Sequence, residues 1–105
     1  MEITYRYTIH PAQQDGKLLL EFIDLPENKD FSKDLVKAFS EINFEITDTL
    51  DIWQNDEIVM NAVSVIGNFR ILRNVAGYYF IAGDDDKAVI KLDAILSGNN
   101  EFLKV

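Results

Sequence analysis

In this 105-residue chain, the feature that most resembles a catalytic or metal-binding motif is a run of three aspartates, Asp84 to Asp86. A calcium loop counted from Asp84 would need glycine at its sixth position and glutamate at its twelfth, where the chain has Val89 and Ile95. A magnesium site needs only one or two carboxylates and a phosphate, and spacing leaves it open, but no glycine-rich phosphate loop is present. We therefore predict a helix start with Asp84 as its N-cap, with an acidic patch facing a partner as the alternative, and no metal or cofactor.

Other catalytic groups are scarce. His10 is the only histidine, and histidine is the side chain that titrates near neutrality without help. There is no cysteine, and no serine lies in the G-x-S-x-G pattern that activates a nucleophile. Catalytic and cofactor-binding residues are therefore not assigned, and the sequence predicts a protein that is not an enzyme.

The middle of the chain is unusually acidic. Between Lys37 and Arg70 there is no basic residue. The acidic residues in this interval are Glu41, Glu45, Asp48, Asp51, Asp56 and Glu57. The whole chain carries a formal charge of −8, which argues against nucleic acid, because a surface that follows phosphates needs clustered Lys and Arg. An acidic surface is instead steered toward basic partners.

Hydrophobic periodicity predicts the elements that must position these residues. Strict alternation from Glu2 to Ile9 and a dense apolar run from Leu18 to Leu25 indicate two strands. Helical spacing follows in the stretch 31–42, with Ser32 as its N-cap and Asn43 at its end. Four further strands with short connections span 44–82, and a last helix runs from Asp85 to Ser97, closed by a left-handed Gly98.

The predicted fold is α+β, an antiparallel sheet of about six strands in the order ββ-α-ββββ-α with two helices packed on it. Length and composition, with 48% apolar and 27% charged residues, indicate a single globular domain over residues 1–105. No run is long enough to span a membrane and the N-terminus lacks the features of a signal peptide, so we expect a cytoplasmic protein with no membrane partner.

A period of two along residues 44–53 suggests where a partner would bind. If Phe44, Ile46, Leu50 and Ile52 face the core, then Glu45, Thr47, Thr49, Asp51 and Trp53 face the other way. The only tryptophan would then share a surface with carboxylates, and tryptophan is enriched among the anchors of protein interfaces. The predicted partner-binding residues are Trp53, Glu45, Asp48, Asp51, Asp56 and Glu57. Burial of Trp53 against the sheet or a helix is the alternative.

The leading hypothesis is a small acidic binding protein that docks on and blocks a basic protein, as bacterial immunity proteins do with toxins. This is an analogy of class and composition. A second hypothesis is a regulatory or structural module that self-associates through an exposed sheet edge or face, forming a homo-oligomer. A third is a small enzyme or ligand binder with a pocket between sheet and helices, in which Arg70 or Arg73 holds an anion.

Overall fold

A computed structural model describes residues 5–12, 15–24, 30–52, 57–74 and 76–105. Its elements in chain order are β1 (Tyr5–Pro11), β2 (Leu18–Asp24), α1 (Phe31–Ala38), the 3-10 turn η1 (Ser40–Ile42), β3 (Glu45–Ile52), β4 (Glu57–Ser64), β5 (Gly67–Arg73), β6 (Tyr79–Gly83), α2 (Asp86–Ser97) and β7 (Phe102–Lys104).

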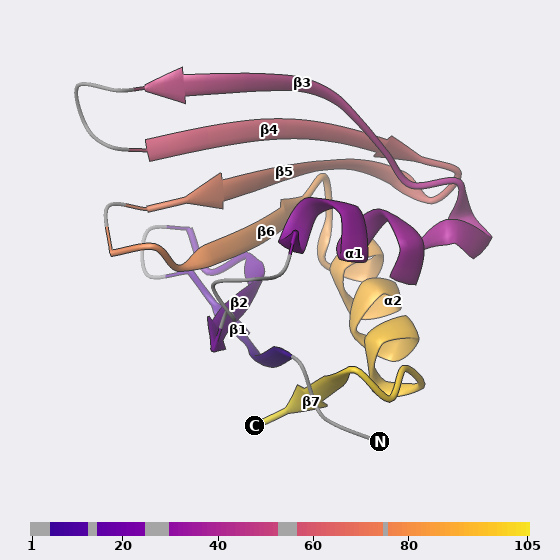
Figure 1. The fold of residues 1–105 in the computed structure, drawn as a ribbon. Helices are drawn as coiled ribbons and strands as arrows, with labels where there is room; N and C mark the ends of the chain where they lie inside the picture. Colours follow the sequence, from indigo (N-terminus) through magenta and orange to yellow (C-terminus); the bar gives the residue numbers. More distant parts are fainter. Residues whose placement is uncertain (1–4, 13–14, 25–29, 53–56, 75) are drawn as a thin grey trace.

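All the strands of the described residues belong to one sheet, in the spatial order β3-β4-β5-β6-β2-β1-β7. Both helices lie on the same side of this sheet, which curls around them (Figure 1). We call this the helix side and the opposite side the open face. The predicted α+β architecture with two helices is confirmed.

The predicted antiparallel sheet of about six strands is roughly right, but the observed sheet differs in two respects. Among the described residues it has seven strands, and it is mixed, because β7 pairs in parallel with β1 while all other neighbours are antiparallel. β7 is only three residues long, which is too short for an alternation of apolar and polar residues to predict a strand. It forms because α2 returns the chain to the free edge of β1, where Phe102 stacks on the ring of Tyr5.

The helix boundaries differ from the sequence-based expectations, by two residues at the start of α1 and by one residue at the start of α2. The N-cap of α1 is Asp30, whose carboxylate accepts from the Lys33 N–H at 3.1 Å, rather than Ser32. Asn43 does adopt the left-handed conformation, with φ 55°, but it closes the 3-10 turn that follows the helix. Gly98 ends α2 in a right-handed conformation, so its predicted left-handed cap is wrong.

The core lies between the sheet and the helices and is rich in aromatic rings. Tyr5, Tyr7 and Phe22 are fully buried on the helix side. The rings of Phe22 and Phe31 meet edge to face, with centroids 4.8 Å apart, which docks α1 on the sheet. Gly83 allows close approach at α2, because a Cβ there would come within 3.1 Å of the Val89 side chain and closer still to the Phe69 ring.

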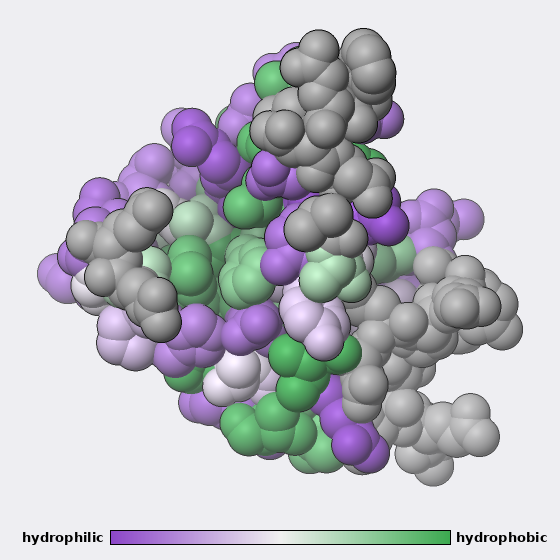
Figure 2. All heavy atoms as spheres, turned by 90° about the vertical axis from the view of Figure 1, so that its left-hand side faces the viewer, coloured by the Kyte–Doolittle hydropathy of each residue, from purple (hydrophilic) through white to green (hydrophobic). Residues whose placement is uncertain are grey.

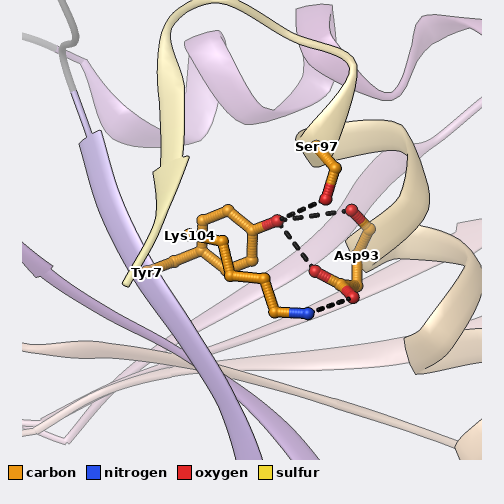
Figure 3. A network of polar contacts seen from close by, with 4 residues as sticks. All are labelled: Tyr7, Asp93, Ser97 and Lys104. Atoms are coloured by element: carbon orange, nitrogen blue, oxygen red, sulfur yellow. Dashed lines mark hydrogen bonds and ion pairs between the residues drawn. The ribbon is translucent and has the colours of Figure 1, made fainter.

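Polar contacts at the edge of this core fix α2 and the C-terminal strand (Figure 3). The Tyr7 hydroxyl donates to the Asp93 carboxylate at 2.8 Å and lies 3.2 Å from the Ser97 hydroxyl. The other carboxylate oxygen of Asp93 pairs with the Lys104 ammonium at 3.0 Å. Burial raises the pKa of Tyr7 to about 12, the Asp93 bond adds to this rise, and the Ser97 bond opposes it. The network joins β1, α2 and β7.

Candidate functional site

β3 forms one edge of the sheet and carries most of the predicted partner-binding residues. Only β4 pairs with it, so its outer backbone groups have no strand partner among the described residues. The side chains of Glu45, Asp48 and Asp51 are all exposed. Glu57, at the start of β4, is half-buried and pairs across the strands with Ile52. We call the exposed β3 residues Glu45, Asp48, Leu50 and Asp51 the acidic edge.

The predicted distribution of these residues over two faces is wrong, because β3 contains a bulge. Ile46 pairs with Ala62 and Asp48 with Asn61, which leaves Thr47 as an extra residue without a partner in the ladder. A one-residue insertion moves every later side chain to the opposite face. The Thr47 hydroxyl donates to the Asn61 carbonyl at 3.3 Å, and this bond holds the bulge.

Because of the bulge, Leu50 and Asp51 lie on the faces of the sheet opposite to those predicted. Leu50 pairs with Val59 on the open face and is 62% exposed, so its predicted place in the core is wrong. Asp51 instead pairs with Ile58 on the helix side. Glu45 precedes the bulge and stays on the open face, whereas Asp48 follows it and is moved to that face. The edge therefore presents acidic groups on both sides of the sheet and an apolar side chain between them.

Trp53 and Asp56 lie outside the described residues, so the predicted role of the tryptophan as an anchor stays a prediction. Leu50 is the apolar residue of this edge that the structure does describe, and alternation alone did not identify it. The only signal in the sequence was Asp48, whose charge interrupts the run of apolar residues at alternate positions.

The three consecutive aspartates each accept a different backbone N–H. Asp85, rather than Asp84, is the N-cap of α2 and accepts from the Ala88 N–H at 2.9 Å. Asp84 accepts from the Asn68 N–H at 3.2 Å. Asp86 accepts from the Leu18 N–H at 2.9 Å. The carboxylates thus point toward three separate elements, and within the described residues no group of three or more His, Asp or Glu side chains is arranged to hold a metal ion.

His10 lies on the open face at the end of β1. Its Nε2 is 2.9 Å from a carboxylate oxygen of Glu21 on β2. The hydrogen bond to Glu21 raises the pKa of His10, because it favours the protonated ring. The residue makes a cross-strand contact, and the described residues place no serine nucleophile in hydrogen-bond contact with it.

Two adjoining cavities open on this same face of the sheet, and both include Arg70 in their walls. The larger, of about 410 Å³, also has Lys17, Asn61 and Asp84 in its lining. The smaller, of about 280 Å³, is lined by Leu19, Leu72, Phe80 and Ala82 besides Arg70. These cavities lie on the face opposite the one on which sequence reasoning expected a pocket.

Hydrophobic and hydrophilic residues alternate in small groups over part of the surface. Figure 2 shows the side at the left of Figure 1, where hydrophobic groups reach the surface between hydrophilic ones. Hydrophilic residues therefore lie beside apolar surface on that side of the molecule. No helix in the described part of the chain is both long and apolar enough to cross a membrane.

Comparison of the chain with protein-family models, with curated proteins and with solved structures finds no match.

Proposed function

We propose that this chain is a non-enzymatic binding protein that docks its acidic edge on a basic protein and blocks that partner, as an immunity protein blocks a toxin. The observation that supports the proposal is that the most acidic segment of the chain forms an edge strand of the sheet. The interval without basic residues, between Lys37 and Arg70, contains β3, the longer of the two edge strands in the described part of the chain.

The geometry of the edge suits a partner with a basic, extended segment. Glu45 and Asp48 project on the open face and Asp51 on the helix side, so a strand laid along β3 would meet carboxylates on both of its faces. Outward backbone groups of an edge strand add main-chain hydrogen bonds to such a complex. Leu50 supplies apolar area between Asp48 and Asp51, and these charges set the association rate and exclude acidic competitors.

The same charges disfavour self-association through this edge. If two copies paired along β3, the acidic side chains of one would face those of the other. Like charges placed opposite one another destabilise a strand pair. The alternative of a self-associating module is therefore less well supported than binding of a basic partner.

The test is affinity capture with three versions of the protein, followed by titration of the purified partner. The first version is the unchanged chain, and the second carries Glu45→Gln, Asp48→Asn and Asp51→Asn. The third is a control of equal charge with the substitutions Asp30→Asn, Asp86→Asn and Glu101→Gln. The first of these control substitutions keeps an N-cap side chain at the start of α1, because asparagine caps helices about as well as aspartate.

We expect the edge variant to bind the captured protein at least about tenfold more weakly than the control variant does, since several rim charges are lost. Binding should also weaken as salt rises, and the partner's own activity should be inhibited by the unchanged chain. Equal affinity of the edge and control variants would refute the proposal, and so would affinity independent of salt.

A further inference from the structure

The open face of the sheet contains a hollow that the proposed docking edge does not use. Its position follows from the strand register, in which Asn61, Arg70, Ala82 and Leu19 form one row across β4, β5, β6 and β2. Ala82 is the smallest side chain in this row and stands between two long ones. The sheet surface is therefore depressed at Ala82, which lines both cavities.

One half of the hollow is apolar. Leu19, Leu72, Phe80 and Ala82 line the smaller cavity of about 280 Å³, and all four are half-buried. Water held against such a surface is released when an apolar group replaces it. The volumes of the two neighbouring cavities, about 280 Å³ and about 410 Å³, suit a small molecule, and the smaller one offers the apolar part of the site.

The other half is charged, and its charges balance. Lys17 and Arg70 line the larger cavity together with Asp15 and Asp84. Within the described residues neither of these cations has a carboxylate within 4.0 Å, although the chain is strongly acidic. Asp15 and Asp84 each use one oxygen to accept a backbone N–H, from Lys17 at 3.0 Å and from Asn68 at 3.2 Å, so each carboxylate keeps a second oxygen.

Such a lining matches a ligand that carries both signs of charge beside an apolar group. A guanidinium binds a carboxylate through two parallel hydrogen bonds, and the free oxygens of Asp15 and Asp84 accept from an ammonium group. A simple anion would instead meet two carboxylates, and a simple cation would meet Lys17 and Arg70. We propose that this hollow binds a small apolar α-amino acid, with its carboxylate on Arg70, its ammonium group on Asp84 and its side chain over Ala82.

The proposal does not depend on the function of the acidic edge. The hollow is built from residues of β2, β4, β5 and β6 together with Asp15, Lys17 and Asp84, whereas the edge is β3. Asn61 on β4 is the one lining residue whose cross-strand partner, Asp48, belongs to the edge.

The test is a titration of the ¹⁵N-labelled protein with L-phenylalanine, followed by NMR chemical shifts. We expect saturable shifts of amides on β5 and β6, with a dissociation constant on the order of millimolar or tighter for so small a ligand. Three probes each lack one part of the ligand: 3-phenylpropionate has no ammonium group, phenylalaninamide has no carboxylate, and glycine has no apolar side chain. Each should bind at least about fivefold more weakly.

Variants locate the site. Arg70→Gln should weaken L-phenylalanine binding at least about tenfold, and Ala82→Leu should abolish it by filling the hollow. Arg73→Gln is the matched control, because Arg73 lies on the same strand but pairs with Ile58 on the helix side. Circular dichroism establishes that each variant is folded.

Several results would overturn the proposal. These are the absence of saturable shifts with L-phenylalanine, equal binding of 3-phenylpropionate, and equal weakening by Arg70→Gln and Arg73→Gln in folded proteins. Loss of partner capture in the edge variant bears only on the proposed function, since that variant keeps every residue of the hollow.

Discussion

The hydroxyl of Tyr7 on β1 donates a 2.8 Å hydrogen bond to the carboxylate of Asp93 on α2, which lies 86 residues further along the chain. The first strand and the last helix are thus joined by the polar contacts of this hydroxyl at the margin of an aromatic core. Because Asp93 also pairs with Lys104, the same carboxylate holds the last strand against the first.

Tyr7→Phe should therefore lower the free energy of unfolding by about 1 to 2 kcal/mol, because Asp93 loses a hydrogen-bond donor while the ring stays buried. Urea denaturation measures the change. Tyr78→Phe is the matched control, since Tyr78 is 43% exposed, and its effect should stay within about 0.5 kcal/mol. A loss of equal size in both variants would contradict the role assigned to the Tyr7 hydroxyl.

The raised pKa of Tyr7 predicts how the stability of the folded protein changes at alkaline pH. Its folded pKa of about 12 lies above the ordinary value of 10.0, so the folded state favours the neutral form. The resulting stabilisation is complete below pH 10 and is lost as the pH rises toward 12. Tyrosinate absorbance, recorded on the unchanged protein and on Tyr7→Phe, should differ by one group that ionises near pH 12. A difference centred near pH 10 would contradict this assignment.

The contact between His10 and Glu21 predicts a second, smaller dependence on pH. Because the folded pKa of His10 is raised above 6.5, protonation favours folding. This stabilisation is fully present below pH 6.5 and is lost as the pH rises through the folded pKa. His10 is 40% exposed, so the effect should remain below about 1 kcal/mol. NMR titration of the ring measures the pKa directly, and Glu21→Gln should lower it, whereas an unchanged pKa in that variant would contradict the contact.

The N-cap of α2 predicts a contrast between two substitutions at one position. Asp85→Ala removes the acceptor for the Ala88 N–H and should cost about 0.5 to 2 kcal/mol. Asp85→Asn keeps an acceptor and should cost much less, because the asparagine side chain can accept the same hydrogen bond. Thermal or urea unfolding measures both. Equal losses in the two variants would show that the charge of Asp85, and not its hydrogen bond, is what matters.

The bulge in β3 predicts that Leu50 contributes little to stability. Leu50→Ala should change the free energy of unfolding by less than about 0.5 kcal/mol, since the side chain is 62% exposed. Ile71→Ala, at a fully buried position of the same sheet, should cost about 2 to 5 kcal/mol. If Leu50→Ala lost as much stability as Ile71→Ala, then Leu50 would be a core residue, and this result would contradict the bulge in β3. Partner binding, in contrast, should weaken in Leu50→Ala.

Local patterns sufficed for much of the fold because each depends on neighbours in the chain. Alternation identified the strands that contain Tyr7 and Ile71, and helical spacing identified α2 with its buried Val89 and Leu92. The cap residues were misplaced, the true caps being Asp30 and Asp85, because nearby polar residues offer equivalent oxygens and only the backbone angle selects one of them.

The candidate sites were less accessible to prediction. The exposure of Leu50 depends on the unpaired Thr47, and Thr47 is stabilised by a bond to the Asn61 carbonyl of another strand. The hollow at Ala82 depends on which residues of β5 and β2 stand beside it, Arg70 and Leu19. Neither relationship has a signature within its own segment.

Amino-acid order alone thus determined the α+β class, the positions of most elements and the acidity of the central segment, because hydrophobic period and charge are properties of short stretches of chain. Tertiary structure decided that β7 joins β1, that Leu50 faces solvent and that Ala82 lies between Arg70 and Leu19. These features arise from pairing between distant strands, where a shift of one residue reverses which face a side chain occupies.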